Sequence, residues 1–524
     1  MYNSSSRFWK IAASVPLATT AISGSAQSAS FTAPAANKNA GTWTFHHEHV
    51  LGTSFEITIR ATNINEAKRA EAAALAAFDH DDAILSTWRA NSEVSRWAQT
   101  QFTPVAISAE LFDVLSQFDA WRERTSGALD PSVEAATRLW RTAATEGRVP
   151  TEQEIATALE AIQQPHWSLD AEHRTATRLS DVPLALASFT KSYVSSRAAD
   201  AAVKAGATGV MLNVGGDVIV RGDIAQMVAI ANPFASAEND HALDYIVVRN
   251  RAVATSGSYR RGFEIAAALT TLTPRFSHLI NPHTAQPSSH VVSSTVIATD
   301  AVTAGALATA FSILPVEESR RLAASHSDVQ YLLILKDGEQ VSSVGWPQSP
   351  GLRTAAFLHS AARPAAQATA GLWNPAFELS IDINLPRIED ARYRRPFVAV
   401  WVEDADHYPV RTLALWFDKS RWLPDLKQWY RDDQVRSLTE GTDISQTISS
   451  ATRSPGHYTL KWDGKDNEGK SVKAGKYIIC IEAAREHGGY DLQRHELDFN
   501  GNAQKAALPE AKELGAATLD YRKR

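Results

Sequence analysis

The sequence predicts a chain in two parts, in which helices and strands are mixed at first and strands alone follow. Up to about residue 346, apolar residues at helical spacing alternate with short apolar runs that are typical of strands. Between Gly351 and Gly371 the composition shifts toward Ala, Pro and Thr, which indicates an interdomain linker. Beyond it, alternating apolar and polar residues between turn signals predict an all-β sandwich of immunoglobulin-like size. Local pattern alone does not decide whether the first part has a parallel or an antiparallel sheet.

Length and composition agree with a globular protein of two or three domains. The chain has 524 residues, of which 44% are hydrophobic and 21% are charged, as in ordinary globular proteins. The formal net charge of -6 gives no support to nucleic-acid binding, for which a basic stripe is expected. Cys480 is the only cysteine, so the chain cannot form an intramolecular disulfide.

The N-terminus has the three-part layout of a secretory signal, which we predict at residues 1–29. Two basic residues precede the uncharged segment Ile11–Gly24, and small residues follow it. This order predicts cleavage between Ala26 and Ala29, and a disordered tail is the alternative. No cysteine stands at the cleavage site to carry a lipid, and no later apolar run is long enough to span a bilayer. We therefore expect an exported, periplasmic protein that is not a lipoprotein.

The predicted elements of the first part follow from apolar spacing and capping residues. Residues 65–85 and 109–124 carry apolar side chains at helical spacing. Asp130 stands directly before a proline where a further helix begins, so on local grounds it is a helix cap. Strands at 245–248 and 251–255 are expected to pair as a hairpin. The other predicted strands are 50–59, 210–214, 218–220, 227–231, 294–298 and 329–336.

The stretch 185–222 is the most informative part of the chain. It predicts a loop that holds Lys191, a helix over 195–204 and a buried strand. The tight turn Gly215-Gly216-Asp217 and a second strand follow. Glycine takes backbone conformations that bend a turn or admit a close neighbour, and a strand that enters such a turn is a common construction of ligand sites.

Eight short segments resemble the ApbE family, the FAD:protein FMN transferases, in their order and spacing. They are HVLGTSFEI (49–57), STWRANSEVSRW (86–97), GALDPSV (127–133), FTKSY (189–193), LNVGGDVIVRGD (212–223), VATSGSY (253–259), SHLINPHT (277–284) and AGALATAF (304–311). Together they are far more specific than any one of them. The C-terminal part resembles an uncharacterised periplasmic β-domain that occurs fused to or beside this family.

The resemblance implies an α+β transferase domain with mixed or antiparallel sheets and flanking helices at residues 42–350, after a short linker at 30–41. A linker at 351–371 and a β-sandwich at 372–500 follow, and residues 501–524 are expected to form a C-terminal tail. The implied reaction moves FMN from FAD to a Ser or Thr of a target flavoprotein of the cell envelope, and AMP is released. Such phosphoryl chemistry is assisted by Mg²⁺, which prefers carboxylate oxygens.

The resemblance also assigns roles to individual residues. Lys191 and His278 are the expected catalytic residues and also contact the cofactor. The metal is expected at Ser188 and Thr309, with Asp300 as a nearby carboxylate. The remaining expected FAD contacts are Leu51, Trp88, Ala128, Leu129 and Asp130.

Several family positions are changed, and they keep two other functions open. Gly305 stands where the family has its principal Mg²⁺ carboxylate, and Ala185 and Ser258 also replace acids. The first alternative is a degenerate member that binds FAD or a partner without catalysis. The second is an envelope redox protein that itself carries flavin, for which Thr452 lies in a weak match to a flavinylation sequence.

Overall fold

The computed structural model describes residues 41–51, 53–259, 262–265, 275–347, 371–389, 393–417, 420–440, 449–450, 452–486 and 488–524. The predicted signal sequence at 1–29 lies outside the described residues. So do residues 351–370 of the predicted linker. We describe the part before this linker and the part after it separately.

The first part is built on one eight-stranded sheet, in which every neighbouring pair of strands is antiparallel. The expectation of mixed or antiparallel sheets with flanking helices is therefore confirmed. In spatial order the strands are β1 (Gly41–Val50), β2 (Thr53–Ala61), β6 (Gly209–Val214), β7 (Asp217–Gly222), β10 (Ala252–Gly257), β15 (Val291–Ala298), β16 (Gln330–Leu335) and β17 (Gln340–Ser342).

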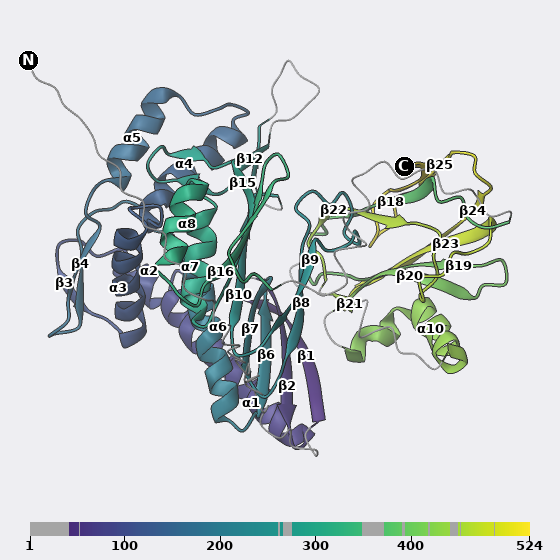
Figure 1. Cartoon of the computed structure of the whole chain (residues 1–524), viewed down its shortest axis with the longest axis horizontal. Coiled ribbons are helices and arrows are strands. Elements are labelled where there is room, and N and C mark those ends of the chain that lie inside the picture. The colour runs from purple at the N-terminus through teal and green to yellow at the C-terminus, as the bar shows by residue number, and fades with distance from the viewer. Residues whose placement is uncertain are drawn as a thin grey trace, which may run out of the picture. The chain divides into compact units, whose positions relative to one another are not determined.

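Alanine-rich helices cover one face of this sheet (Figure 1). Ala70, Ala198 and Ala306 are fully buried, and they share a core with Ile57 and Leu212 of the sheet. Small side chains let the helices approach each other and the sheet closely. The helices of this part are α1 (Ile64–Leu85), α2 (Glu93–Trp97), α3 (Ala109–Arg124), α4 (Glu134–Thr145), α5 (Glu152–Ile162), α6 (Ala187–Lys204), α7 (Ala301–Phe311) and α8 (Val316–Ala324).

A two-stranded ribbon packs on the opposite face of the sheet. Ile230 and Ile246 of the ribbon are buried with Val220 and Ile297 of the sheet. The sheet is thus covered on both faces, which explains why its central strands read as continuous apolar runs rather than alternating ones. The ribbon is β8 (Gln226–Ile230) with β9 (Asp244–Val248), and the remaining short strands are β3 (Pro104–Ala106), β4 (Trp167–Asp170), β5 (Thr175–Arg178), β11 (Gly262–Glu264), β12 (Arg275–Ser277), β13 (Ile280–Asn281) and β14 (Gln286–Pro287).

The pairing of β8 with β9 corrects the predicted hairpin of residues 245–248 and 251–255. β9 pairs with β8, whereas β10 pairs with β7 and β15 in the main sheet. A short connection signals a chain reversal, but it does not decide which strand accepts the hydrogen bonds. That choice depends on which apolar faces meet in the core.

The second part is a sandwich of two sheets around a shared core. Ile381, Val400 and Leu519 from both sheets are fully buried in it. One sheet has the order β22-β18-β26-β25 and the other β21-β20-β19-β23-β24. The strands are β18 (Phe377–Leu385), β19 (Phe397–Glu403), β20 (Pro409–Trp416), β21 (Ser449–Ser450), β22 (Gly456–Trp462), β23 (Gly475–Ala484), β24 (Tyr490–Phe499), β25 (Gln504–Leu508) and β26 (Ala517–Lys523).

Two features of this part differ from the prediction. Residues 501–524 are not a tail, because β26 lies between β18 and β25 and buries Leu519 and Tyr521. In addition, helix α10 (Lys427–Glu440) covers the outer face of the five-stranded sheet, where Trp429 packs with Trp401. Only a few of the helix residues are buried and most are charged or polar, so its helical periodicity is weak in the sequence.

Within the described residues, every helix is too short or too polar to span a lipid bilayer.

Candidate active site

Lys191 and Asp217 form the polar centre of the first part. Helix α6 begins at Ala187, so Lys191 lies on its first turns and not in the predicted loop. Its Nζ is 3.1 Å from Oδ2 of Asp217, and the Oγ of Ser192 is 3.4 Å from the same oxygen. The helix starts earlier than its sequence indicates because Phe189 is fully buried and packs against Phe118 of α3.

Asp217 reaches this position through the tight turn that joins β6 to β7. Gly215 and Gly216 have φ angles of 55° and 96°, which other residues adopt only at a cost. A Cβ on Gly215 would also lie 2.6 Å from the Thr53 hydroxyl of β2. The turn then places the carboxylate of Asp217 at the start of β7, where the residue is 8% exposed. A buried carboxylate needs a partner of opposite charge, and Lys191 supplies it.

The Thr309 side chain links α7 to helix α6 and to strand β10. Its Oγ1 is 3.2 Å from the carbonyl oxygen of Ser188 on α6 and 3.2 Å from the Oγ of Ser256 on β10. It is also 3.1 Å from the carbonyl oxygen of Gly305, one helical turn earlier, which is a common contact of a threonine inside a helix. The described contacts of this hydroxyl are therefore all with neutral oxygens.

Gly305 faces Ser192 across the contact between α6 and α7. A Cβ built on Gly305 would lie 2.5 Å from the Oγ of Ser192 and 3.1 Å from its Cβ. Both residues are buried, so the serine occupies the space that a side chain at position 305 would need. Ser192 thereby connects Gly305 with the Lys191–Asp217 pair.

Asp130 is held in a second polar cluster beside the chain that leads into α6. Its Oδ1 accepts a hydrogen bond of 2.9 Å from the Ser132 backbone N–H, and its Oδ2 is 2.8 Å from the Nε of Arg122. The capping role expected on local grounds is thus present. Just beyond it, the backbone N–H of Ala185 donates to the carbonyl of Pro131 at 2.8 Å, so the loop before α6 touches the Asp130 loop.

The other predicted cofactor residues come from separate loops of this part. Trp88 lies in the loop between α1 and α2 and is 90% exposed. Leu51 has a φ of 49° in the turn between β1 and β2. His278 stands between β12 and β13 and is partly buried, whereas Ala128 and Leu129 beside Asp130 are fully buried. Burial of Ala128 and Leu129 leaves little of their side chains to contact a ligand.

The structure does not bring Asp300 to Thr309. Asp300 caps the N-terminus of α7, where its Oδ2 accepts a hydrogen bond of 2.7 Å from the backbone N–H of Thr303. Thr309 follows nine residues later, so the two lie about 13 Å apart along the helix axis. Of the three expected metal residues, only Ser188 and Thr309 are in contact with each other.

The sequence reasoning missed three residues that complete this cluster, namely Asp217, Ser192 and Ser256. A signal for Asp217 was present, because an acid directly after a double-glycine turn stands at the start of the strand that follows the turn. Ser192 and Ser256 carry no local signal. Ser256 meets Thr309 only because β10 packs on α7, and Ser192 meets Gly305 only because α6 packs on α7.

Two other places in the first part have features of a functional site. His80, Asp81 and Glu110 have the geometry of metal ligands, but the Arg197 guanidinium already pairs with both acids, at 2.8 Å and 3.0 Å. Burial raises the pKa of Asp81, although Arg197 opposes this change. Because the arginine already supplies the positive charge, this cluster is an ion-pair network between helices.

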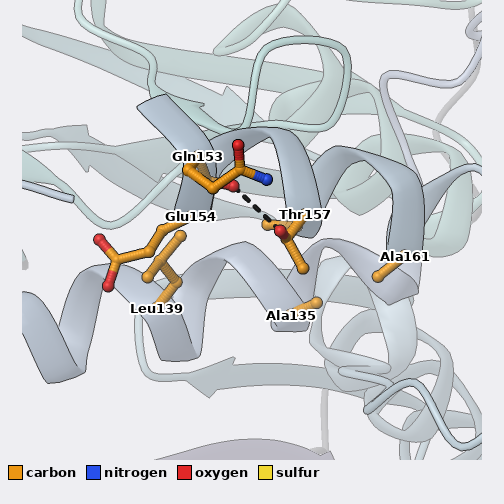
Figure 2. A pocket seen from close by; sticks show the side chains of 7 residues that line it. Ala135, Leu139, Gln153, Glu154, Thr157 and Ala161 are labelled. Atoms are coloured by element: carbon orange, nitrogen blue, oxygen red, sulfur yellow. Dashed lines mark hydrogen bonds between the residues drawn. The ribbon is translucent and has the colours of Figure 1, made fainter. Parts of the chain in front are cut away.

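The second place is a groove of about 370 Å³ between α4 and α5, which Figure 2 shows. Its polar residues are satisfied locally, since Arg148 pairs with Glu154 at 2.8 Å and the Thr157 hydroxyl donates to the carbonyl of Gln153 at 2.9 Å. None of the predicted site residues lines it. The lining consists of Ala135, Leu139, Gln153, Glu154, Thr157, Ala158 and Ala161.

Comparison with known proteins identifies the family. The sequence profile of the ApbE family matches residues 51–333, which is more than half of the chain. The chain belongs to the ApbE family. A second profile, described as a predicted periplasmic protein (DUF2271), matches residues 378–516, so the ApbE-like part is followed by a domain of this second type.

Relatives and solved structures agree with this assignment. The chain is 28% identical to the FAD:protein FMN transferase of Klebsiella pneumoniae (strain 342) over 316 residues, which covers 58% of this chain and 87% of the relative. It is 29% identical to the FAD:protein FMN transferase of Haemophilus influenzae over 269 residues, covering 49% of this chain and 75% of the relative. The crystal structure of the ApbE protein from Thermotoga maritima superposes with a TM-score of 0.51 at 27% identity, and covers 58% of this chain and 97% of that one.

Proposed function

We propose that this chain is an exported FAD:protein FMN transferase. The observation that carries the proposal is the Lys191–Asp217 ion pair in contact with the Ser192–Gly305 junction, inside a domain of the ApbE family. The ion pair fixes an ammonium group at a half-buried position, where charge interactions are stronger than in water. FAD is the proposed substrate because the related proteins are named FAD:protein FMN transferases.

The proposed reaction is attack by a Ser or Thr hydroxyl oxygen on the FMN-side phosphorus of the FAD pyrophosphate. A new P–O bond forms to the acceptor, the bridging P–O bond breaks, and AMP leaves while the acceptor loses its proton. Such a step depends mainly on positioning and on stabilisation of negative charge. Lys191 supplies positive charge to the phosphates, and His278 is the second proposed catalytic residue. Trp88, Leu51 and the Ala128–Asp130 loop are the proposed flavin contacts.

Mg²⁺ is the metal that the family resemblance implies, and the described residues fit it poorly. Mg²⁺ is normally held by one or two carboxylates together with substrate phosphates. The oxygens around Thr309 are hydroxyls and carbonyls, and Asp300 is engaged at the other end of α7. We therefore assign no step of the reaction to a metal held by the protein.

We further propose a periplasmic location and a flavoprotein of the cell envelope as the acceptor. The second profile carries the description of a predicted periplasmic protein, which supports export. The signal sequence expected at residues 1–29 lies outside the described residues. It can be checked directly by determining the N-terminal residue of the protein purified from the periplasm.

The decisive experiment separates transfer from binding. The purified full chain is incubated with FAD and an acceptor flavoprotein domain, with EDTA in one arm and Mg²⁺ in the other. We expect covalent FMN on the acceptor, seen as an intact-mass increase, and one AMP per transfer. An acceptor whose target hydroxyl is replaced by alanine serves as the control. Stoichiometric FAD binding without AMP in either arm would contradict the transferase and favour the non-catalytic binding protein.

One observation favours the non-catalytic alternative. Position 305 is a glycine, and the described contacts of the Thr309 hydroxyl include no carboxylate. The flavin-carrying alternative is not favoured by the geometry of Thr452. That residue is buried, at 5% exposure, so its hydroxyl would have to become accessible before any transferase reached it.

A substitution of Trp88 tests the proposed flavin contact. Trp88→Ala is expected to weaken FAD binding about fivefold, because aromatic stacking contributes on the order of 1 kcal/mol. Its exposure predicts no change in thermal stability. Phe102→Ala is the matched control, since Phe102 is also an exposed aromatic, at 70%, without a proposed role. FAD fluorescence titration measures both, and equal affinities of the two variants would contradict the contact.

A further inference from the structure

At the candidate site the positive charge comes from a lysine side chain of the chain itself. Ser192, Asp217 and Lys191 are joined through one oxygen, because the ammonium and the serine hydroxyl both lie against Oδ2 of Asp217. Asp217 is the carboxylate in this group, and it is already neutralised by a cation of the chain itself. A divalent ion that used Oδ2 would have to compete with Lys191 for this oxygen.

Ser192 occupies the space that a carboxylate side chain at position 305 would need. A side chain on Gly305 would have its Cβ 2.5 Å from the serine Oγ and 3.4 Å from the Cα of Phe189. The serine is 3% exposed and fills the junction between α6 and α7. Glycine at 305 and serine at 192 are therefore sterically matched. A carboxylate at 305 requires Ser192 to turn its hydroxyl away and to shift, or to be replaced by a smaller residue.

The oxygens that remain beside this junction are neutral. Thr309 Oγ1 contacts the carbonyl oxygen of Ser188 and the hydroxyl of Ser256 at 3.2 Å each. Hydroxyl and carbonyl oxygens complete the coordination of a hard divalent ion, but they do not offset its charge. The oxygens around Thr309 could thus serve as ligands of a divalent cation, but they carry no negative charge to balance it.

We infer that the resident cation of this site is the Lys191 ammonium, fixed by Asp217, and that the Ser192–Gly305 pair excludes a protein-held divalent cation beside Thr309. The inference rests on the proposed function, since it takes the FAD pyrophosphate as the anion that the ammonium meets. Two consequences follow. The unliganded protein does not bind a divalent ion at Thr309, and FAD binds equally well in EDTA.

The test is a titration with Mn²⁺, followed by the electron paramagnetic resonance signal of the free ion. The double variant Ser192→Gly/Gly305→Asp is expected to bind Mn²⁺ at least about tenfold more tightly than the wild type. Ser192→Gly/Gly305→Asn is the matched control, because it has the same shape without the charge and is expected to behave as the wild type. Thr309→Val is expected to leave the wild-type titration unchanged and to remove the gain of the double variant.

Two results would overturn the inference. One is Mn²⁺ binding by the wild type that Thr309→Val abolishes, and the other is loss of FAD binding by the wild type in EDTA. Neither result requires the double variant, so they decide the matter even if the double variant does not fold. AMP release is scored separately, so that bound FAD without AMP would refute the transferase and leave this inference intact.

Discussion

Lys191→Met is expected to lower the rate of the proposed FMN transfer by about two orders of magnitude, the loss typical when one preorganised charge-stabilising group is removed from an active site. The ammonium is held 3.1 Å from Asp217, so we expect it to meet the phosphates of FAD without first having to be ordered. Methionine keeps the length of the side chain and removes only its charge. Release of AMP from FAD, measured at saturating acceptor, gives the rate.

Two controls separate a loss of charge from a loss of structure. Lys204→Met makes the same exchange at the exposed end of the same helix and is expected to leave the rate unchanged. Lys191→Met also leaves Asp217 buried without its partner, which lowers the free energy of unfolding. Lys191→Met/Asp217→Asn is expected to restore that stability and not the rate. Recovery of transfer in the double variant would show that Lys191 only holds the structure.

Glu513→Gln is expected to destabilise the C-terminal sandwich by about 3 kcal/mol, because it removes the carboxylate charge that faces the buried Arg485 guanidinium. The Glu513 side chain has no exposed surface, and its Oε2 is 3.0 Å from the Nε of Arg485. Its Oε1 accepts a hydrogen bond of 2.7 Å from the backbone N–H of Gly489. The glutamine removes the charge while keeping the shape.

Hydrogen exchange of peptides from β23 and β24, followed across a urea series, measures this change within the sandwich alone. Glu510→Gln is the control, since Glu510 lies three residues earlier and is exposed. An unchanged exchange midpoint for Glu513→Gln would contradict the structural role of residues 501–524.

Local patterns were sufficient for elements whose signals lie within one turn or one strand. Helix α3 is found at the predicted residues 109–124, and α1 ends at Leu85 as predicted. Their caps are local: the Ser108 and Asn63 side chains accept hydrogen bonds from backbone N–H groups three residues later. The order of eight segments likewise predicts the ApbE family, whose profile matches residues 51–333.

What only the tertiary structure decided are the relations between distant segments. Sequence spacing does not show that β26 enters the sandwich between β18 and β25, or that α6 extends back to include Lys191. It suggested that Asp300 lies near Thr309, although Asp300 caps the N-terminus of α7 and Thr309 lies near the C-terminus of the same helix. Above all, Ser192 and Gly305 are 113 positions apart in the sequence and touch only because α6 packs on α7. Packing decides such contacts because burial rewards whichever surfaces meet, whatever their distance along the chain.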